Sequence, residues 1–406
     1  VEDLVEPNLM FLGTDDGLYI SINAGKKWTK WTEGFPTTSV KDLVIHPREH
    51  DLVIGTFGRA AWVLDDIRPL RDMARNASVI NSSITLFNPP TAYQAAYQQP
   101  TGSRFGADAM YHGENRGSGA RFSYVFNKNT SVDTDEKDES SDEDDSEKEE
   151  AKVKWDSLTL KLYDGSRLIR TLKTKTPKEN GIQKWTWYMD EAGVSRPSRT
   201  IRKRKNEPRG VSVKPGTYKL VMQYGDQTSE SAITVESDPR YDVPQKAIDD
   251  SYNAAKDLEA MTQVAADAVK QLVESKNLAN DYKKMINKPD DKKAYKDELA
   301  SIKDMDKRID EVIALYIGKV DKRQGITRNP EITVMNRIGA ASGYVRSRPN
   351  GLTTTETTLM SHARNELQSA LEKTNTFFST EWAPFETTLK AMDVSSFKEI
   401  KTFKLN

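Results

Sequence analysis

The sequence has no cysteine and only four histidines among its 406 residues. The lack of cysteine excludes disulfides, thiolate metal sites and cysteine nucleophiles. No apolar run approaches the ~18 residues of a membrane helix, so we predict no membrane-spanning segment. The first residues carry no signal peptide and do not begin with Met, and we expect the natural start of the protein to lie upstream.

The formal net charge is −1, so no overall field attracts nucleic acid or anionic lipid, and no nucleic-acid partner is predicted. Within this nearly neutral chain there are two clusters of opposite charge. Residues 133–150 hold twelve acidic residues and two lysines, and we expect them to be disordered because like charges repel. Residues 196–209 hold seven basic residues and one Glu. This run is expected to be a solvated loop that pairs with the acidic stretch, with binding to phosphates or an acidic partner as the alternative.

Residues 8–66 show short strand patterns separated by turn signals, including the turn Asp15-Asp16-Gly17. Leu12-Gly13-Thr14 aligns with Ile54-Gly55-Thr56, an offset of 42 residues, which is the period of a four-stranded propeller blade. Two copies do not close a propeller, which typically has about four to eight blades. The sequence therefore predicts further blades upstream or on another chain.

Between the copies lies Ser21-Ile-Asn-Ala-Gly-Lys-Lys-Trp28, which resembles the Asp-box Ser-x-Asp-x-Gly-x-x-Trp with Asn23 at the Asp position. Ser21 and Asn23 can hydrogen-bond the backbone of the turn, and Gly25 can adopt positive φ. Trp28 is expected to be buried between neighbouring sheets. We interpret all four residues as a structural motif.

The chain is similar to the end of the propeller in bacterial sortilin-like Asp-box proteins. These proteins are common in Bacteroidota and are often labelled glycosyl hydrolases. The resemblance rests on residues 11–28, on residues 56–66, on Pro215-Gly-Thr-Tyr218 and on Asp238-Pro-Arg240. It implies a large propeller with most of its blades upstream, and export to the periplasm or cell surface of a Gram-negative bacterium.

The predicted fold is multidomain β plus α. The end of a β-propeller (1–66) is followed by a linker or long loop (67–119), and then by an immunoglobulin-like or fibronectin type III-like β-sandwich (120–237) into which the acidic and basic runs are inserted. Strands of the sandwich are predicted over residues 121–126, 157–163, 168–172, 183–188, 216–224 and 229–235, with hairpin turns at Asp164-Gly165 and Gly225-Asp226. Apolar residues at three- and four-residue steps predict a carboxy-terminal antiparallel helical bundle (238–406), with a break at residues 287–290 and a limit at Pro384.

Few residues are candidates for catalysis or for binding a ligand or metal. Arg59, Asp65 and Asp66 lie near predicted strand ends and could face a propeller channel, and Glu114 and Arg116 lie in a Gly-rich loop that could cover it. Salt bridges between blades are the alternative role. His46 and His50 flank Pro47 in a turn and cannot share a helix face as zinc ligands do. No metal, cofactor or complete catalytic site is predicted.

Aromatic residues gather in Trp185-Thr-Trp-Tyr188. Strand alternation places half of them in the core of the sandwich, and stacking of the other half on a sugar ring is the alternative.

Two functions fit these features. The first is an exported recognition and scaffold protein whose propeller binds a peptide or glycan, while the sandwich and bundle dock partner subunits of a surface or outer-membrane complex. The second is a glycoside hydrolase-like enzyme whose active site lies in upstream blades.

Overall fold

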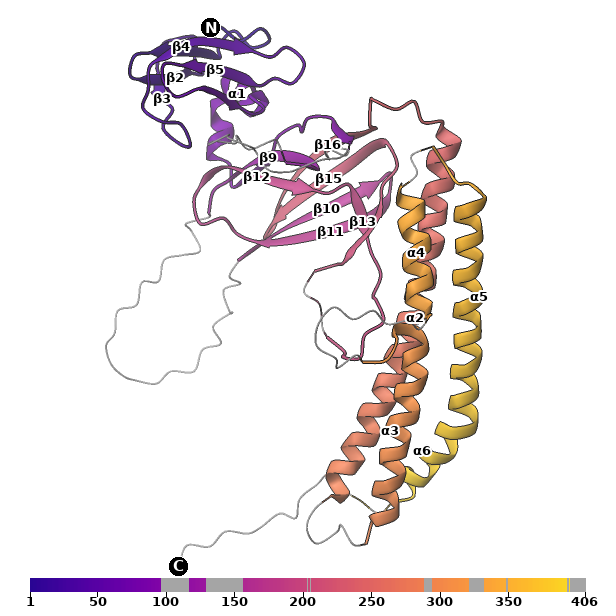
Figure 1. Cartoon of the computed structure of the whole chain (residues 1–406). Coiled ribbons are helices and arrows are strands. Elements are labelled where there is room, and N and C mark those ends of the chain that lie inside the picture. The colour runs from indigo at the N-terminus through magenta and orange to yellow at the C-terminus, as the bar shows by residue number, and fades with distance from the viewer. Residues whose placement is uncertain are drawn as a thin grey trace, which may run out of the picture. The chain divides into compact units, whose positions relative to one another are not determined.

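The computed structural model describes residues 1–95, 117–128, 156–202, 204, 206–287, 294–320, 332–347, 350–392 and 394. These residues form a mixed β plus α fold with several sheets and a carboxy-terminal helical region (Figure 1). The chain divides into two compact units. The first comprises Val1–Asp190 and Pro215–Asp242, and the second comprises Glu191–Lys214 and Val243–Asn406.

The first unit begins with two three-stranded antiparallel sheets. They consist of β1 (Met10–Thr14), β2 (Gly17–Ser21) and β3 (Thr29–Lys30), and of β4 (Val40–Ile45), β5 (Leu52–Thr56) and β6 (Ala61–Leu64). The predicted hairpin around Asp15-Asp16-Gly17 is confirmed, and both copies of the repeat seen in the sequence form antiparallel hairpins. Leu12 pairs with Tyr19 in the first sheet, as Ile54 pairs with Trp62 in the second.

The inner faces of these two sheets share one core with the helix α1 (Arg68–Arg75). Alternation along the strands buries Phe11 and Leu43, and α1 adds Leu70 and Met73. The prediction of a linker or long loop is therefore wrong for this part of the chain. A short η1 turn (Ala77–Asn81) follows the helix. Helix α1 escaped sequence analysis because it has only eight residues, four of them charged, with a proline in its first turn.

Two further sheets complete the first unit. A five-stranded sheet has the order β11-β10-β15-β16-β8 and a three-stranded sheet the order β12-β9-β7. The strands are β7 (Ile84–Leu86), β8 (Ala92–Gln94), β9 (Ala120–Phe126), β10 (Ser157–Asp164), β11 (Arg167–Lys175), β12 (Gly181–Trp187), β15 (Gly216–Tyr224) and β16 (Gln227–Ser237). Six of these strands were predicted. The first two lie in the predicted linker, and β8 pairs in parallel with β16.

The five-stranded sheet and the β12-β9-β7 sheet, called here the two larger sheets, pack against each other through aromatic side chains. The Phe126 and Tyr224 rings lie 5.1 Å apart edge to face, and the Trp187 and Tyr218 rings 5.5 Å apart. Trp187 is completely buried, whereas Tyr188 is exposed. The predicted division of the aromatic cluster between core and surface is confirmed.

The second unit is mainly helical, and it also contains β14 (Arg209–Ser212) and all but the first residue of β13 (Asp190–Ala192). Its helices are α2 (Gln245–Ile286), α3 (Lys296–Ile317), α4 (Val334–Ser347), α5 (Thr354–Phe377) and α6 (Ala383–Lys390). The 42 residues of α2 span about 63 Å at ~1.5 Å per residue. None of the described helices is both long enough and apolar enough to cross a membrane.

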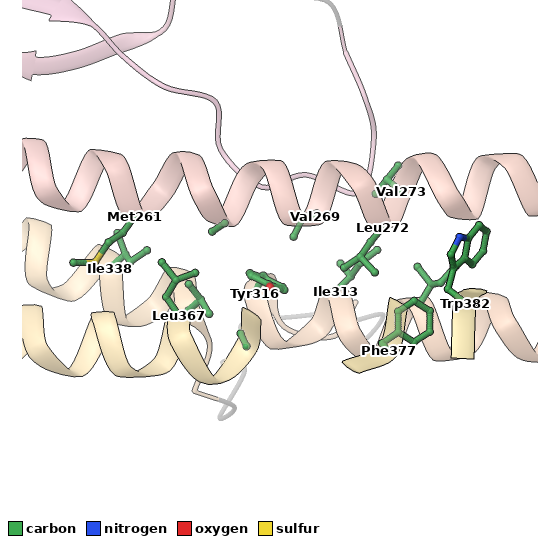
Figure 2. Close-up of a cluster of buried hydrophobic side chains, with 14 of the residues drawn as sticks. Met261, Val269, Leu272, Val273, Ile313, Tyr316, Ile338, Leu367, Phe377 and Trp382 are labelled. Atoms are coloured by element: carbon green, nitrogen blue, oxygen red, sulfur yellow. The ribbon is translucent and has the colours of Figure 1, made fainter. Parts of the chain in front are cut away.

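Helix directions follow from polar contacts along the helices. Lys276 contacts Asp310, and Asn280 contacts Asp306, so α3 runs antiparallel to α2. Between them and α5 lies a continuous apolar core, part of which is drawn in Figure 2. Within this core the Tyr316 hydroxyl lies 2.7 Å from the Thr374 hydroxyl, so its polar end is satisfied without water.

Two expectations about this unit are corrected. Pro384 does not end the last helix, because it occupies the first turn of α6, after a π-helical turn (Phe378–Trp382) that continues α5. The described part of the basic run is not a separate solvated loop of the sandwich, because residues 191–214 belong to the helical unit. Its Arg199 donates a hydrogen bond to the Gly318 carbonyl and lies 3.5 Å from Asp310. The acidic run lies outside the described residues.

Candidate functional site

A cavity of about 660 Å³ lies in the first unit, next to the end of β6. Its volume falls within the range of about 300–1,000 Å³ typical of small-molecule sites. The described residues that line it come from the turn before β5, the end of β6, the start of β8, strand β9 and strand β12. Those whose side chains bear on the argument are Glu49, Asp65, Asp66, Thr91, Tyr93, Ser118, Arg121, Ser123 and Lys184.

One wall of the cavity carries carboxylates that are engaged in ion pairs. Asp65 lies 3.0 Å from the Arg121 guanidinium, and Asp66 lies 2.6 Å from Nε of Arg68. Glu49 is paired with its neighbour Arg48 at 2.7 Å. Each carboxylate therefore has its charge balanced by an arginine, while its oxygens retain capacity to accept further hydrogen bonds.

The backbone holding Asp66 is tightly specified. Asp66 has a φ of +58°, a conformation that non-glycine residues adopt only when their surroundings enforce it. Its amide donates to Asp51 at 2.9 Å, and the Ile67 amide donates to the His50 carbonyl at 2.8 Å. These bonds tie the end of β6 to the turn that carries Glu49.

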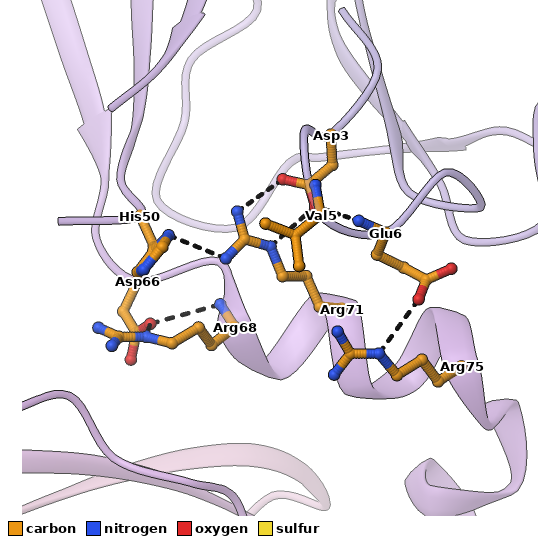
Figure 3. A network of polar contacts seen from close by, with 8 residues as sticks. All are labelled: Asp3, Val5, Glu6, His50, Asp66, Arg68, Arg71 and Arg75. Carbon is orange, nitrogen blue, oxygen red and sulfur yellow. Dashed lines mark hydrogen bonds and ion pairs between the residues drawn. The ribbon is translucent and has the colours of Figure 1, made fainter. Parts of the chain in front are cut away.

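A buried polar network lies behind this wall (Figure 3). Arg71 makes two parallel hydrogen bonds to Asp3, at 2.8 and 2.7 Å, and its third nitrogen lies 2.9 Å from Nδ1 of His50. Burial acts to raise the pKa of Asp3, but hydrogen bonds from Arg71 and from the Glu6 and Val5 amides outweigh it and lower that pKa. The network fastens the amino-terminal segment to α1.

His50 belongs to this network rather than to a metal site. Burial, together with the charges of Arg71 and Arg68, lowers its pKa, and the neutral imidazole can accept a hydrogen bond from Arg71. His46 instead accepts a hydrogen bond from the Glu49 amide at 3.1 Å. Both histidines thus shape the turn between β4 and β5, as their position around Pro47 suggests. The described residues contain no cluster of His, Asp or Glu suited to a metal ion.

Another part of the lining comes from the β12-β9 pair. Lys184 lies directly across from Ser123, and residues paired in this way share one face of an antiparallel sheet. On the same face, Val125 packs into the core formed by the first two sheets. Strand β9 is thus packed on both faces. The cavity lies on the face that carries Ser123 and Val125, where the first two sheets cover the strand only in part.

A glycine permits the chain to enter β9. Gly119 has a φ of +105°, and a Cβ there would lie 2.8 Å from Cγ2 of Thr186 and 3.0 Å from the Trp187 carbonyl oxygen. A larger residue would therefore displace the β9-β12 edge that bears the cavity wall.

Four lining side chains that are exposed or half-buried remain available for a ligand. Lys184, Tyr93, Thr91 and Ser118 make no side-chain hydrogen bond or ion pair with any other part of the chain that the structure describes. Lys184 and Thr91 are exposed, and Tyr93 is half-buried. The cavity therefore offers an ammonium, three hydroxyls and an aromatic ring beside a row of paired carboxylates.

The residues predicted to face a ligand are only partly brought together. Asp65 and Asp66 line the cavity, but each has its own arginine partner. Arg59 lies in the exposed turn between β5 and β6, away from the cavity lining. Glu114 and Arg116 lie outside the described residues.

Sequence reasoning missed Lys184, Tyr93 and Arg121. Alternation opposite Trp185 and Trp187 marks Lys184 as facing away from the sandwich core. It does not indicate that a cavity lies on that side.

The Asp-box loop lies apart from the cavity lining. The Ser21 hydroxyl accepts a hydrogen bond from the Gly25 amide at 3.0 Å, and the Asn23 side chain accepts one from the Lys27 amide at 2.8 Å. Gly25 has a φ of +78°. These contacts match the predicted turn. Trp28 is 36 % exposed in the described structure, so its expected burial between neighbouring sheets stays a prediction.

No protein-family model, curated protein or solved structure matches this chain.

Proposed function

We propose that the chain is the carboxy-terminal part of an exported Asp-box propeller protein that recognises a peptide or glycan at the periplasm or cell surface of a Gram-negative bacterium. The supporting features are the Ser21–Gly25 loop and the antiparallel β1-β2 and β5-β6 hairpins, which the two copies of the repeat form. In this proposal each of the first two sheets is most of one blade. The packed pair of larger sheets is an immunoglobulin-like or fibronectin type III-like sandwich.

The outer faces of the first two sheets support this proposal. On the second sheet, Val44, Val53 and Val63 are paired side by side across the strands, and Val44 and Val63 are 54 % and 55 % exposed. On the first sheet, Leu12 and Trp28 are exposed. Each propeller blade buries its faces against its neighbours, so upstream blades would cover these residues, including Trp28.

The proposal that the chain recognises a ligand rests on one observation, namely the cavity with its arginine-paired carboxylates and unengaged polar side chains. Hydrolysis of a glycosidic bond requires a carboxylic acid that donates a proton and a second carboxylate that acts as nucleophile or base. Each carboxylate of the cavity is instead held by an arginine, an arrangement that presents carboxylate oxygens to hydrogen-bond donors. The hydrolase alternative then requires a separate site in upstream blades.

Binding arrays of immobilised glycans and peptides test this function with the complete chain. We expect retention on a subset of one array, and loss of that retention in Tyr93→Ala, which removes the aromatic ring from the cavity. Tyr188→Ala is the matched control, because Tyr188 is an exposed tyrosine of the same unit outside the cavity lining.

Two results would overturn the proposal. Equal retention of both variants and the parent would show that binding occurs outside the cavity. Cleavage of a retained glycan by the parent, abolished in Asp65→Asn, would show that the cavity is a hydrolytic site.

A further inference from the structure

We infer that the cavity is specific for a carboxylate-bearing sugar, such as a uronic acid residue of an acidic glycan, with Lys184 as the residue that binds its carboxylate. The inference rests on the proposed recognition function and names the class of ligand for the same site.

The charges around the cavity favour a ligand with one negative group. Glu49, Asp65 and Asp66 are each paired with an arginine, at 2.7, 3.0 and 2.6 Å. Lys184 adds a positive charge that no ion pair within the described structure balances. A single carboxylate would neutralise it through a charge-assisted hydrogen bond.

The same charges disfavour a phosphate group. A phosphate monoester carries about −1.5 to −2 charges near neutral pH, and the cavity places it beside three carboxylates. Only one of its charges would meet an unpaired cation, and the other would be repelled by the carboxylates of the lining. A carboxylate is the anion whose charge matches the site.

The polar groups are arranged for hydroxyl groups rather than for a peptide. The carboxylate wall accepts hydrogen bonds, and the hydroxyls of Thr91, Ser118 and Tyr93 both donate and accept, which complements the hydroxyls of a sugar. Pro90 and Tyr93, both half-buried, supply apolar surface. The described lining has no exposed aliphatic side chain that could form the apolar pockets by which peptides are usually selected.

Calorimetry with three probes tests the inference on the complete chain. The probes are linear trigalacturonate, its neutral counterpart galactotriose, and triglutamate, which carries carboxylates on a peptide. The key variant is Lys184→Met, which removes the charge but keeps much of the side-chain length. Lys173→Met is the matched control, because Lys173 is an exposed lysine on β11, at the opposite edge of the sheet from β8.

We expect the parent and Lys173→Met to bind trigalacturonate at least about tenfold more tightly than galactotriose, as a charge-assisted hydrogen bond provides. Lys184→Met should lose this preference and bind both saccharides alike. The preference of the parent should also weaken as salt is added.

The outcomes separate the inference from the proposed function. If the parent binds both saccharides equally and Tyr93→Ala abolishes both, the cavity recognises glycans but the assignment of an acidic sugar is wrong. Tighter binding of triglutamate than of trigalacturonate would show a peptide site and also overturn the inference. Binding of none of the probes, together with no retention on either array, would refute both proposals.

Discussion

Replacing Arg71 with methionine would leave the Asp3 carboxylate buried without its guanidinium partner. The Asp3 side chain is fully buried and that of Arg71 is 5 % exposed. Two hydrogen bonds at 2.7 and 2.8 Å join them. Removing one partner of a buried pair typically costs ~3–5 kcal/mol, because the remaining charge stays desolvated. For a unit of this size each kcal/mol lowers the melting temperature by about 2–4 °C, so we expect a decrease of about 6–20 °C.

Arg75 provides the control on the same helix. Its side chain is 51 % exposed and pairs with Glu6 at 3.1 Å and with Asp72 at 3.0 Å. Exposed pairs contribute ~0–1 kcal/mol, so Arg75→Met should shift the melting temperature by only a few degrees. The assay is thermal unfolding followed by tryptophan fluorescence and circular dichroism. Equal shifts for Arg71→Met and Arg75→Met would show that burial of the Asp3 pair does not contribute as the structure implies.

The pH dependence of the same variants gives an independent test. Because the pKa of Asp3 is lowered in the folded state, its contribution to stability is present above its ordinary value of 3.8 and is lost as the pH falls below it. The double variant Asp3→Asn with Arg71→Met should recover part of the lost stability, since no unpaired charge remains buried. It should also lose less stability than the parent on acidification to pH 3. A double variant as unstable as Arg71→Met alone would contradict this account.

Two further variants test the helical unit. Tyr316→Phe should lower its stability by ~1 kcal/mol through loss of the hydrogen bond to Thr374. Burial raises the pKa of Tyr316, so the parent should lose stability as the pH rises above about 10, and Tyr316→Phe should lose less, in urea titrations at pH 8 and pH 11. Equal alkaline losses in parent and variant would refute this. Arg199→Ala should speed amide hydrogen exchange in the segment around residue 199 without affecting exchange in α2, because Arg199 contacts Gly318 and Asp310. Arg202→Ala is the control. If both variants exchange at the same rate, Arg199 does not anchor the segment.

Local patterns in the sequence determined much of the secondary structure. Alternating apolar residues and the glycine turns at Gly165 and Gly225 predicted strands β9, β10, β11, β12, β15 and β16. The Ser21–Gly25 hydrogen bonds followed from the motif itself, because all its partners lie within a few residues. Likewise the three- and four-residue apolar spacing and the break after Ile286 predicted α2, since a helix buries a face that its own sequence specifies.

Tertiary structure alone decided the features that depend on partners far apart in the chain. Short elements such as α1, β7 and β8 have too weak a local pattern to be predicted from the sequence. Contacts with distant segments hold them in place, as where Ala92 of β8 pairs with Val235, about 140 residues away. Trp28 has the motif of a buried residue, yet its exposure depends on whether another sheet covers it.

The candidate site likewise depends on contacts between residues that are far apart in the sequence. Asp65 could be selected as polar and close to a strand end, but its partner Arg121 lies 56 residues away. Lys184 looks like an ordinary surface lysine until the pairing of β12 with β9 places it beside Ser123. A sequence specifies which face of a strand is polar. Whether that face meets solvent, a second sheet or a cavity is determined by the packing of elements that the local pattern does not encode.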